Sequence, residues 1–139
     1  MEGVKAALSS VENINLSQRA AIAAALTRSV TLWQGPPGTG KTRTLIALME
    51  VLCLASGVTP ERREELGPIL AVADTNAAAD NILAGLLERG VSVVRTGRPA
   101  KVRPELQHAC LEAQAERTKL GEKVRGGRAA FIHAYTYAG

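Results

Sequence analysis

The eight residues Gly35-Pro36-Pro37-Gly38-Thr39-Gly40-Lys41-Thr42 decide how the rest of this chain is interpreted. They satisfy the pattern G-x-x-x-x-G-K-[ST], in which glycines let successive backbone N–H groups point at one anion. The helix predicted after the loop adds the positive end of its dipole. The stretch therefore predicts a loop that cradles the phosphates of a nucleoside triphosphate. Lys41 supplies a compact positive charge, and the hydroxyl of Thr42 is a ligand for Mg²⁺, so both are candidate catalytic residues.

Apolar patterns on both sides of the loop predict alternating strands and helices. Residues 30–34 form a short β-rich run, which predicts a buried strand that ends at the loop. Ser17 is the predicted N-cap of a helix before this strand. Downstream, the spacing predicts helices over 42–55, 76–88 and most of 104–124, a short helix over 61–66, and strands over 69–73, 91–94 and 131–135. The alternation of strand and helix favours an α/β fold with a parallel sheet and crossover helices.

Composition and charge narrow the class of protein. The chain has 139 residues, enough for one domain, and is 46% hydrophobic. Residues 1–88 carry 7 basic and 9 acidic side chains, whereas residues 89–139 carry 10 basic and 4 acidic ones. A basic second half fits either a nucleic-acid backbone or a solvated helical face.

Two cysteines and the absence of a long apolar run limit the cellular context. Cys53 and Cys110 are far apart in sequence and predict neither a disulfide framework nor a zinc site. No segment has the apolar length of a signal peptide or a membrane span. We therefore expect no membrane partner, reduced thiols and a cytoplasmic or nuclear location.

The segment before the loop, Asn13-Ile14-Asn15-Leu16-Ser17-Gln18-Arg19-Ala20-Ala21-Ile22, resembles a known family element. It is similar to "LNxSQxxAV" of the superfamily 1B helicases related to the nonsense-mediated-decay and immunoglobulin-mu-binding helicases. The resemblance implies that Gln18 reads the adenine of ATP, and an amide both donates and accepts as adenine requires. Together with Gln18, the cofactor-binding set is then Gly35, Pro36, Pro37, Gly38, Thr39, Gly40, Lys41, Thr42 and Arg43.

A second element lies at residues 69–81, ILAVADTNAAADN, and resembles the family's "CAPSNxAxD". The resemblance implies that Thr75 and Asn76 contact a nucleic-acid backbone. Capping of the following helix is the simpler role for the same residues, and the two roles are compatible. Asp74 stands where the family usually has proline. It also suggests the end of a Walker B strand, but no Glu follows it, so we reject that interpretation.

Residues 93–102, VVRTGRPAKV, resemble the family's "LRLGxPARL". Together the resemblances imply a partial P-loop NTPase (RecA-like) domain, a three-layer α/β/α fold with a parallel sheet. They divide the chain into a partial core at 1–98, a helical insertion at 99–128 and a possible return strand of the core at 129–139.

The implied function is the ATP-binding N-terminal part of an ATP-dependent DNA or RNA helicase. ATP and Mg²⁺ would be its cofactors, and single-stranded DNA or RNA would be its partner. The remainder of the helicase core, or a partner chain, would also be needed. Asp74 and Asp80 are the only aspartates, so there is no Asp-Glu Walker B pair, and we expect weak or absent hydrolysis by this chain alone. The alternatives are a non-catalytic nucleotide- or nucleic-acid-binding module and a fragment of an AAA+ ATPase, because the AAA+ family shares GPPGTGKT.

Overall fold

The structure is a computed structural model that describes residues 2–56, 69–119 and 130–134. The predicted short helix at 61–66 lies outside these residues. In chain order the elements are α1 (Glu2–Ser10), α2 (Leu16–Thr27), α3 (Lys41–Ser56), β1 (Ile69–Ala73), α5 (Asn76–Leu87), β2 (Val93–Thr96), the 3₁₀ helices η1 (Pro99–Lys101) and η2 (Pro104–Ala109), α6 (Leu111–Lys119) and β3 (Ala130–Ala134). In the part of the chain that the structure describes, no helix is long and apolar enough to span a bilayer.

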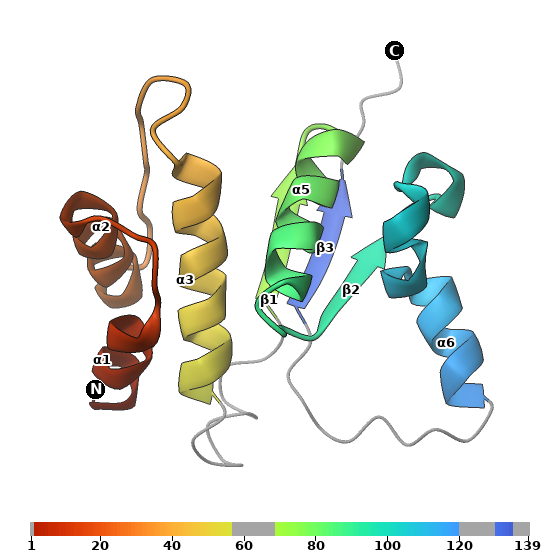
Figure 1. Cartoon of the computed structure of the whole chain (residues 1–139), viewed down its shortest axis with the longest axis horizontal. Coiled ribbons are helices and arrows are strands. Elements are labelled where there is room, and N and C mark those ends of the chain that lie inside the picture. Colours follow the sequence, from red (N-terminus) through yellow and green to blue (C-terminus); the bar gives the residue numbers. More distant parts are fainter. Residues whose placement is uncertain (1, 57–68, 120–129, 135–139) are drawn as a thin grey trace.

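The three described strands form a parallel sheet in the order β1-β3-β2, as the alternation predicts. In the register, Ala71 of β1 and Arg95 of β2 both lie beside Ile132 of β3. α5 connects β1 to β2 and packs on the sheet, since parallel neighbours need a crossover connection (Figure 1). Figure 1 shows that the carboxyl ends of the strands and the loop before α3 both lie toward the upper end of the molecule.

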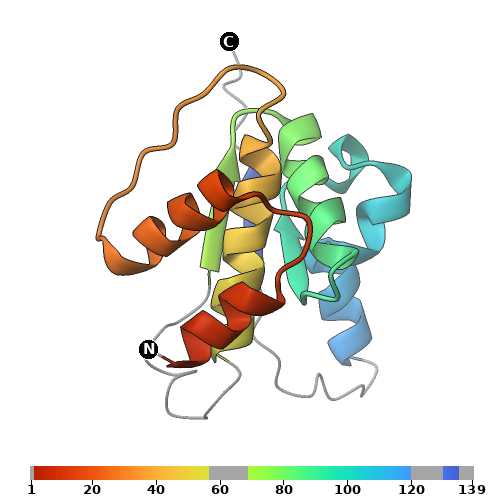
Figure 2. The ribbon, with the colours of Figure 1, turned by 60° about the vertical axis from the view of Figure 1, so that its left-hand side comes forward.

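Two apolar clusters meet at α3. One face of this helix contributes Ile46 and Met49 to a core shared with α5, the sheet and η2. The opposite face contributes Ala47 and Val51 to a smaller core with α1 and α2. Figure 2 shows α1 and α2 lying across α3 on the side away from α5. α3 therefore joins the phosphate loop to both halves of the molecule.

The predicted strand at residues 30–34 is wrong. The segment has no regular secondary structure and pairs with no described strand, and Val30 and Leu32 are 76% and 91% exposed. β-rich composition favours an extended backbone, but a strand also needs a neighbour for its N–H and C=O groups.

A continuous apolar run such as residues 69–73 is typical of a strand covered on both faces, but this strand is not covered on both. In β1 only Ala71 is buried, while Leu70 and Val72 are 66% and 57% exposed. α5 packs on the sheet, and the exposed side chains of Leu70 and Val72 are left without such a cover.

Smaller differences concern where elements begin. Asn15, not Ser17, caps α2, because its side chain accepts from the backbone N–H of Gln18 and Gln18 reciprocates in a capping box. β2 begins at Val93, two residues later than predicted, and β3 begins at Ala130, one residue earlier. Strand ends depend on pairing, which local composition does not specify.

Candidate functional site

The predicted phosphate loop leads directly into α3, whose first residue is Lys41. Gly38 and Gly40 adopt φ of 80° and 82°, a left-handed conformation that L side chains rarely adopt. These two positive-φ positions turn the chain sharply before the helix. The start of a 16-residue helix thus faces the loop, and its unpaired N–H groups favour an anion there.

Lys41 closes the loop on itself. Its Nζ donates to the carbonyl oxygens of Gly35 and Pro36, both at 2.8 Å. The hydroxyl of Thr39 donates to the same Pro36 oxygen at 2.9 Å. Lys41 is exposed, so an incoming phosphate can exchange with these carbonyl partners without opening a buried core.

Gln18 lies against the loop although 21 positions separate it from Thr39. Its Nε2 donates to the Thr39 carbonyl oxygen at 3.2 Å, and its Oε1 accepts from the backbone N–H of Asn15 at 3.0 Å. The approach is close, since a Cβ built on Gly40 would lie 2.6 Å from Gln18 Nε2. The structure thus brings together two motifs that were identified separately in the sequence.

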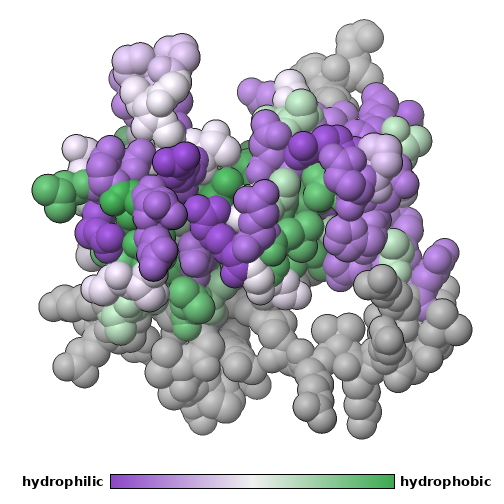
Figure 3. Space-filling view, viewed as in Figure 1, coloured by the Kyte–Doolittle hydropathy of each residue, from purple (hydrophilic) through white to green (hydrophobic). Residues whose placement is uncertain are grey.

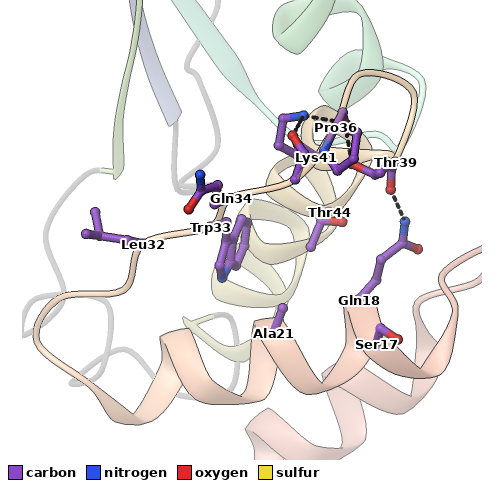
Figure 4. A pocket seen from close by; sticks show the side chains of 11 residues that line it. Ser17, Gln18, Ala21, Leu32, Trp33, Gln34, Pro36, Thr39, Lys41 and Thr44 are labelled. Carbon is purple, nitrogen blue, oxygen red and sulfur yellow. Dashed lines mark hydrogen bonds between the residues drawn. The ribbon is translucent and has the colours of Figure 1, made fainter.

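A cavity of about 400 Å³ opens between α2 and the segment before the loop (Figure 4). Its size lies in the range of small-molecule sites. Of the predicted nucleotide-binding set, Gln18, Gly35, Pro36, Thr39 and Lys41 line it. The sequence did not identify the other lining side chains, which are Ser17, Ala21, Leu32, Trp33, Gln34 and Thr44. The signal for Trp33 was its position two residues before the loop, as the only tryptophan.

A second hollow of about 650 Å³ is lined by further loop residues. Thr42 and Arg43 line this hollow together with Gly38 and Gly40, and do not line the first. Gln18, Thr39 and Lys41 line both. All predicted nucleotide-binding residues except Pro37 therefore line one or both of the hollows that meet at Lys41.

Thr75 and Asn76 lie elsewhere, at the carboxyl end of β1. The hydroxyl of Thr75 accepts from the backbone N–H of Ala78 at 3.1 Å, so Thr75 is the N-cap of α5. The Asn76 Oδ1 accepts from Arg95 Nη2 at 3.0 Å. The capping role left open by the sequence is present, and Asp74 beside it is exposed.

A carboxylate-rich metal site is absent from residues 2–56, 69–119 and 130–134, where no three His, Cys, Asp or Glu side chains cluster. Among the described residues, the Mg²⁺ ligand that the sequence predicts is the hydroxyl of Thr42, which is exposed. This donor set fits Mg²⁺ only together with phosphates, because Mg²⁺ is commonly held by one or two protein oxygens, substrate phosphates and waters.

Comparison with known proteins identifies the family. The model of an AAA domain matches residues 13–132. An uncharacterised ATP-dependent helicase of Methanocaldococcus jannaschii is 39% identical over 70% of this chain and 14% of its own length. The DNA polymerase alpha-associated DNA helicase A of Schizosaccharomyces pombe is 32% identical over 83% of the chain and 16% of its own. The ATP-dependent helicase upf1 of the same yeast is 34% identical over 68% of this chain and 10% of its own length.

The chain thus spans about one sixth or less of the length of these three relatives. The matched region includes the phosphate loop, Gln18 and the β1–α5 junction. The chain belongs to the AAA domain family with the P-loop NTPase fold, in the group that contains the superfamily 1 helicases.

Proposed function

We propose that this chain is the ATP-binding, N-terminal part of an ATP-dependent DNA or RNA helicase, with a partial RecA-like, three-layer α/β/α fold. The observation that carries the proposal is the contact of Gln18 with the phosphate loop, at 3.2 Å from the Thr39 carbonyl. A generic phosphate loop needs no such residue, whereas an ATP site needs an adenine partner beside the loop. Relatives named as ATP-dependent helicases support the same function.

ATP binding follows from the groups around Lys41. The ammonium group leaves the Gly35 and Pro36 carbonyls and binds the β- and γ-phosphates, while the loop N–H groups bind the remaining oxygens. The Thr42 hydroxyl would be the protein's ligand to Mg²⁺, which when bound would supply neutralising charge to the phosphates. Gln18 presents its amide to the adenine edge in the adjoining cavity.

Hydrolysis by this chain alone is weak in this proposal. Asp80 is buried and paired with Arg95 and Arg103, so it is not available to a metal ion. Asp74 is exposed at the end of β1, and no Glu follows it. Because neither aspartate provides a Walker B pair, a non-catalytic ATP-binding module remains the second candidate function. The remainder of a helicase core, or a partner chain, would supply the missing carboxylates and the second motor domain.

We retain the proposed division into a core at 1–98, an insertion at 99–128 and a return strand at 129–139. Two features support it: β3 lies between β1 and β2 in the sheet, and η1, η2 and α6 lie between β2 and β3 in the chain. Thr75 and Asn76 would contact single-stranded DNA or RNA. A cytoplasmic or nuclear location stays a prediction.

The test is isothermal titration calorimetry, which measures the affinity of the chain for a non-hydrolysable ATP analogue in the presence of Mg²⁺. Lys41→Ala should weaken binding by about 10- to 100-fold, because hydrogen bonds from a charged group contribute roughly 1.5–3 kcal/mol. The matched control is Lys101→Ala, which removes an exposed lysine at the end of η1 and should leave affinity unchanged. Equal affinity of the Lys41→Ala variant and the unmodified chain would refute the site.

A further inference from the structure

Arg95 carries a buried guanidinium near the carboxyl ends of the strands. It is 1% exposed and lies on β2, the second strand from the chain start. Its Nε lies 3.5 Å from Asp80 Oδ1, and its Nη1 donates to the Thr96 carbonyl oxygen. Its Nη2 donates to Asn76 Oδ1 at 3.0 Å. One planar group therefore contacts α5 at two positions and the end of its own strand.

Asp80 extends this contact to a third segment. Its Oδ2 accepts from the backbone N–H of Arg103 at 3.0 Å and lies 3.8 Å from Arg103 Nε. The carboxylate is itself 2% exposed, so it balances the charge of Arg95 without solvent. We call the buried pair Asp80 and Arg95, together with their partly exposed partners Asn76 and Arg103, the buried network. It joins the start of α5, the end of β2 and the turn before η2.

The network determines how the Asn76 amide is oriented. A guanidinium has only donors, so the group that faces it must be the amide oxygen. The amide nitrogen, Nδ2, is then the free end. Among the residues that the structure describes, Nδ2 donates to none. The amide nitrogen of Asn76 is therefore a hydrogen-bond donor without a described acceptor, near the carboxyl end of β1.

The surface around this donor is hydrophilic. Figure 3 shows polar side chains gathered over the η1–η2 region, whereas hydrophobic side chains are visible along part of α5. Arg98, Lys101 and Arg103 are exposed in the segment that Asp80 joins to α5, and this segment lies in the half of the chain with excess positive charge. A donor with basic neighbours fits a phosphodiester backbone, which offers only acceptors and negative charge.

We propose that Arg95 is a positioning residue for nucleic-acid binding: it holds the Asn76 oxygen inward so that the amide nitrogen is presented to a backbone phosphate. This inference rests on the proposed function and adds a residue that does not itself touch the nucleic acid. Asp80 keeps Arg95 in place, and its bond to the Arg103 N–H holds the basic segment beside the same donor.

The decisive variant is Asn76→Asp, which keeps the shape of the side chain. One carboxylate oxygen still accepts from Arg95, but the second replaces the donor by a negative charge. We expect affinity for a fluorescein-labelled single-stranded oligonucleotide, measured by anisotropy at fixed salt, to fall at least about 10-fold. The matched control is Asn81→Asp, which adds the same charge at an exposed position of the same helix. The Asn81 Oδ1 accepts from Arg103 Nη2 at 3.4 Å, so the new carboxylate also faces Arg103 but removes no donor of Asn76, and it should lower affinity clearly less than Asn76→Asp.

A mutant cycle separates positioning from general stability. Arg95→Lys keeps the charge but cannot reach three partners with one planar fork. We expect it to weaken binding when Asn76 is present and to have no further effect in an Asn76→Ala background. Additive losses in the cycle would indicate a merely structural role and overturn the inference, as would equal effects of Asn76→Asp and Asn81→Asp.

Nucleotide titration of the same variants distinguishes this inference from the proposed function. Both Asp variants should bind the ATP analogue as the unmodified chain does, because Asn76 lines neither hollow around Lys41. An unmodified chain that binds the analogue but no oligonucleotide overturns the inference and leaves the ATP site intact. An unmodified chain that binds neither overturns both.

Discussion

The phosphate loop and the buried network lie toward the same end of the molecule but are built in opposite ways. Within the loop, Lys41 contacts carbonyls five and six positions away, and the side chains are exposed. In the network, Asp80 contacts Arg95 and Arg103 across 15 and 23 positions, and both charges of the central pair are buried. The loop is an open site defined by adjacent residues, whereas the network is a closed structure that depends on the fold.

The first way to sharpen this difference is Asp80→Ala, for which we expect the largest effect. Removal of one partner leaves the Arg95 guanidinium buried without a counter-charge, which typically costs about 3–5 kcal/mol. The measurement is the free energy of unfolding in urea. A loss of this size is a large fraction of the roughly 5–15 kcal/mol that stabilises a typical domain, so the variant should unfold at much lower urea concentration.

The control for Asp80→Ala is Glu105→Ala, which removes another carboxylate near Arg103. Glu105 Oε1 lies 3.9 Å from Arg103 Nε, and both side chains are substantially exposed. Such surface pairs contribute less than about 1 kcal/mol. Similar losses in the two variants would mean that burial does not set the strength of the network.

The second prediction concerns the loop and has an intermediate effect. Gly40→Ala places a methyl group 2.6 Å from Gln18 Nε2, at a residue with φ of 82°. The left-handed backbone alone costs roughly 1–2 kcal/mol for an L residue, and Gln18 must also move away from Thr39. Titration with the ATP analogue should therefore show affinity lowered at least about 10-fold.

Gly38→Ala isolates the contribution of Gln18 in that experiment. Gly38 has nearly the same φ, 80°, but nothing lies within 4 Å of an added Cβ. The backbone strain is then shared by the two variants, and the Gln18 contact is lost only in Gly40→Ala. If the two variants bind the nucleotide equally well, Gln18 makes no contribution to the site.

The third and smallest effect is a pH dependence beside the network. Burial raises the pKa of the Cys110 thiol, and nearby Glu112 raises it further. The folded chain therefore holds the thiol proton more tightly than the unfolded chain. The stabilisation is full below the ordinary thiol pKa of about 8.5 and decreases as the pH rises above it. The free energy of unfolding should fall more steeply between pH 8 and 10 than in Cys110→Ala, and parallel pH profiles would contradict this.

Local sequence was sufficient for the parts of the fold with strong periodicity. The helices at α3 and α5 and the strand at β1 lie where the apolar spacing predicts them, and the sheet is parallel. The prediction failed at residues 30–34, where composition favours a strand but no described strand pairs with it. It also chose Ser17 over Asn15 as a cap, because both residue types cap helices and only the backbone geometry distinguishes them.

The candidate site divides in the same way. The sequence by itself determined the phosphate loop, since glycine, lysine and threonine act there through the conformation of eight consecutive residues. Only the tertiary structure decided that Gln18 reaches Thr39, that Trp33 lines the cavity and that Arg95 is buried against Asp80 and Asn76. The physical reason is distance along the chain: a turn is specified by its own residues, whereas these contacts form only when α2, α5 and the sheet have packed.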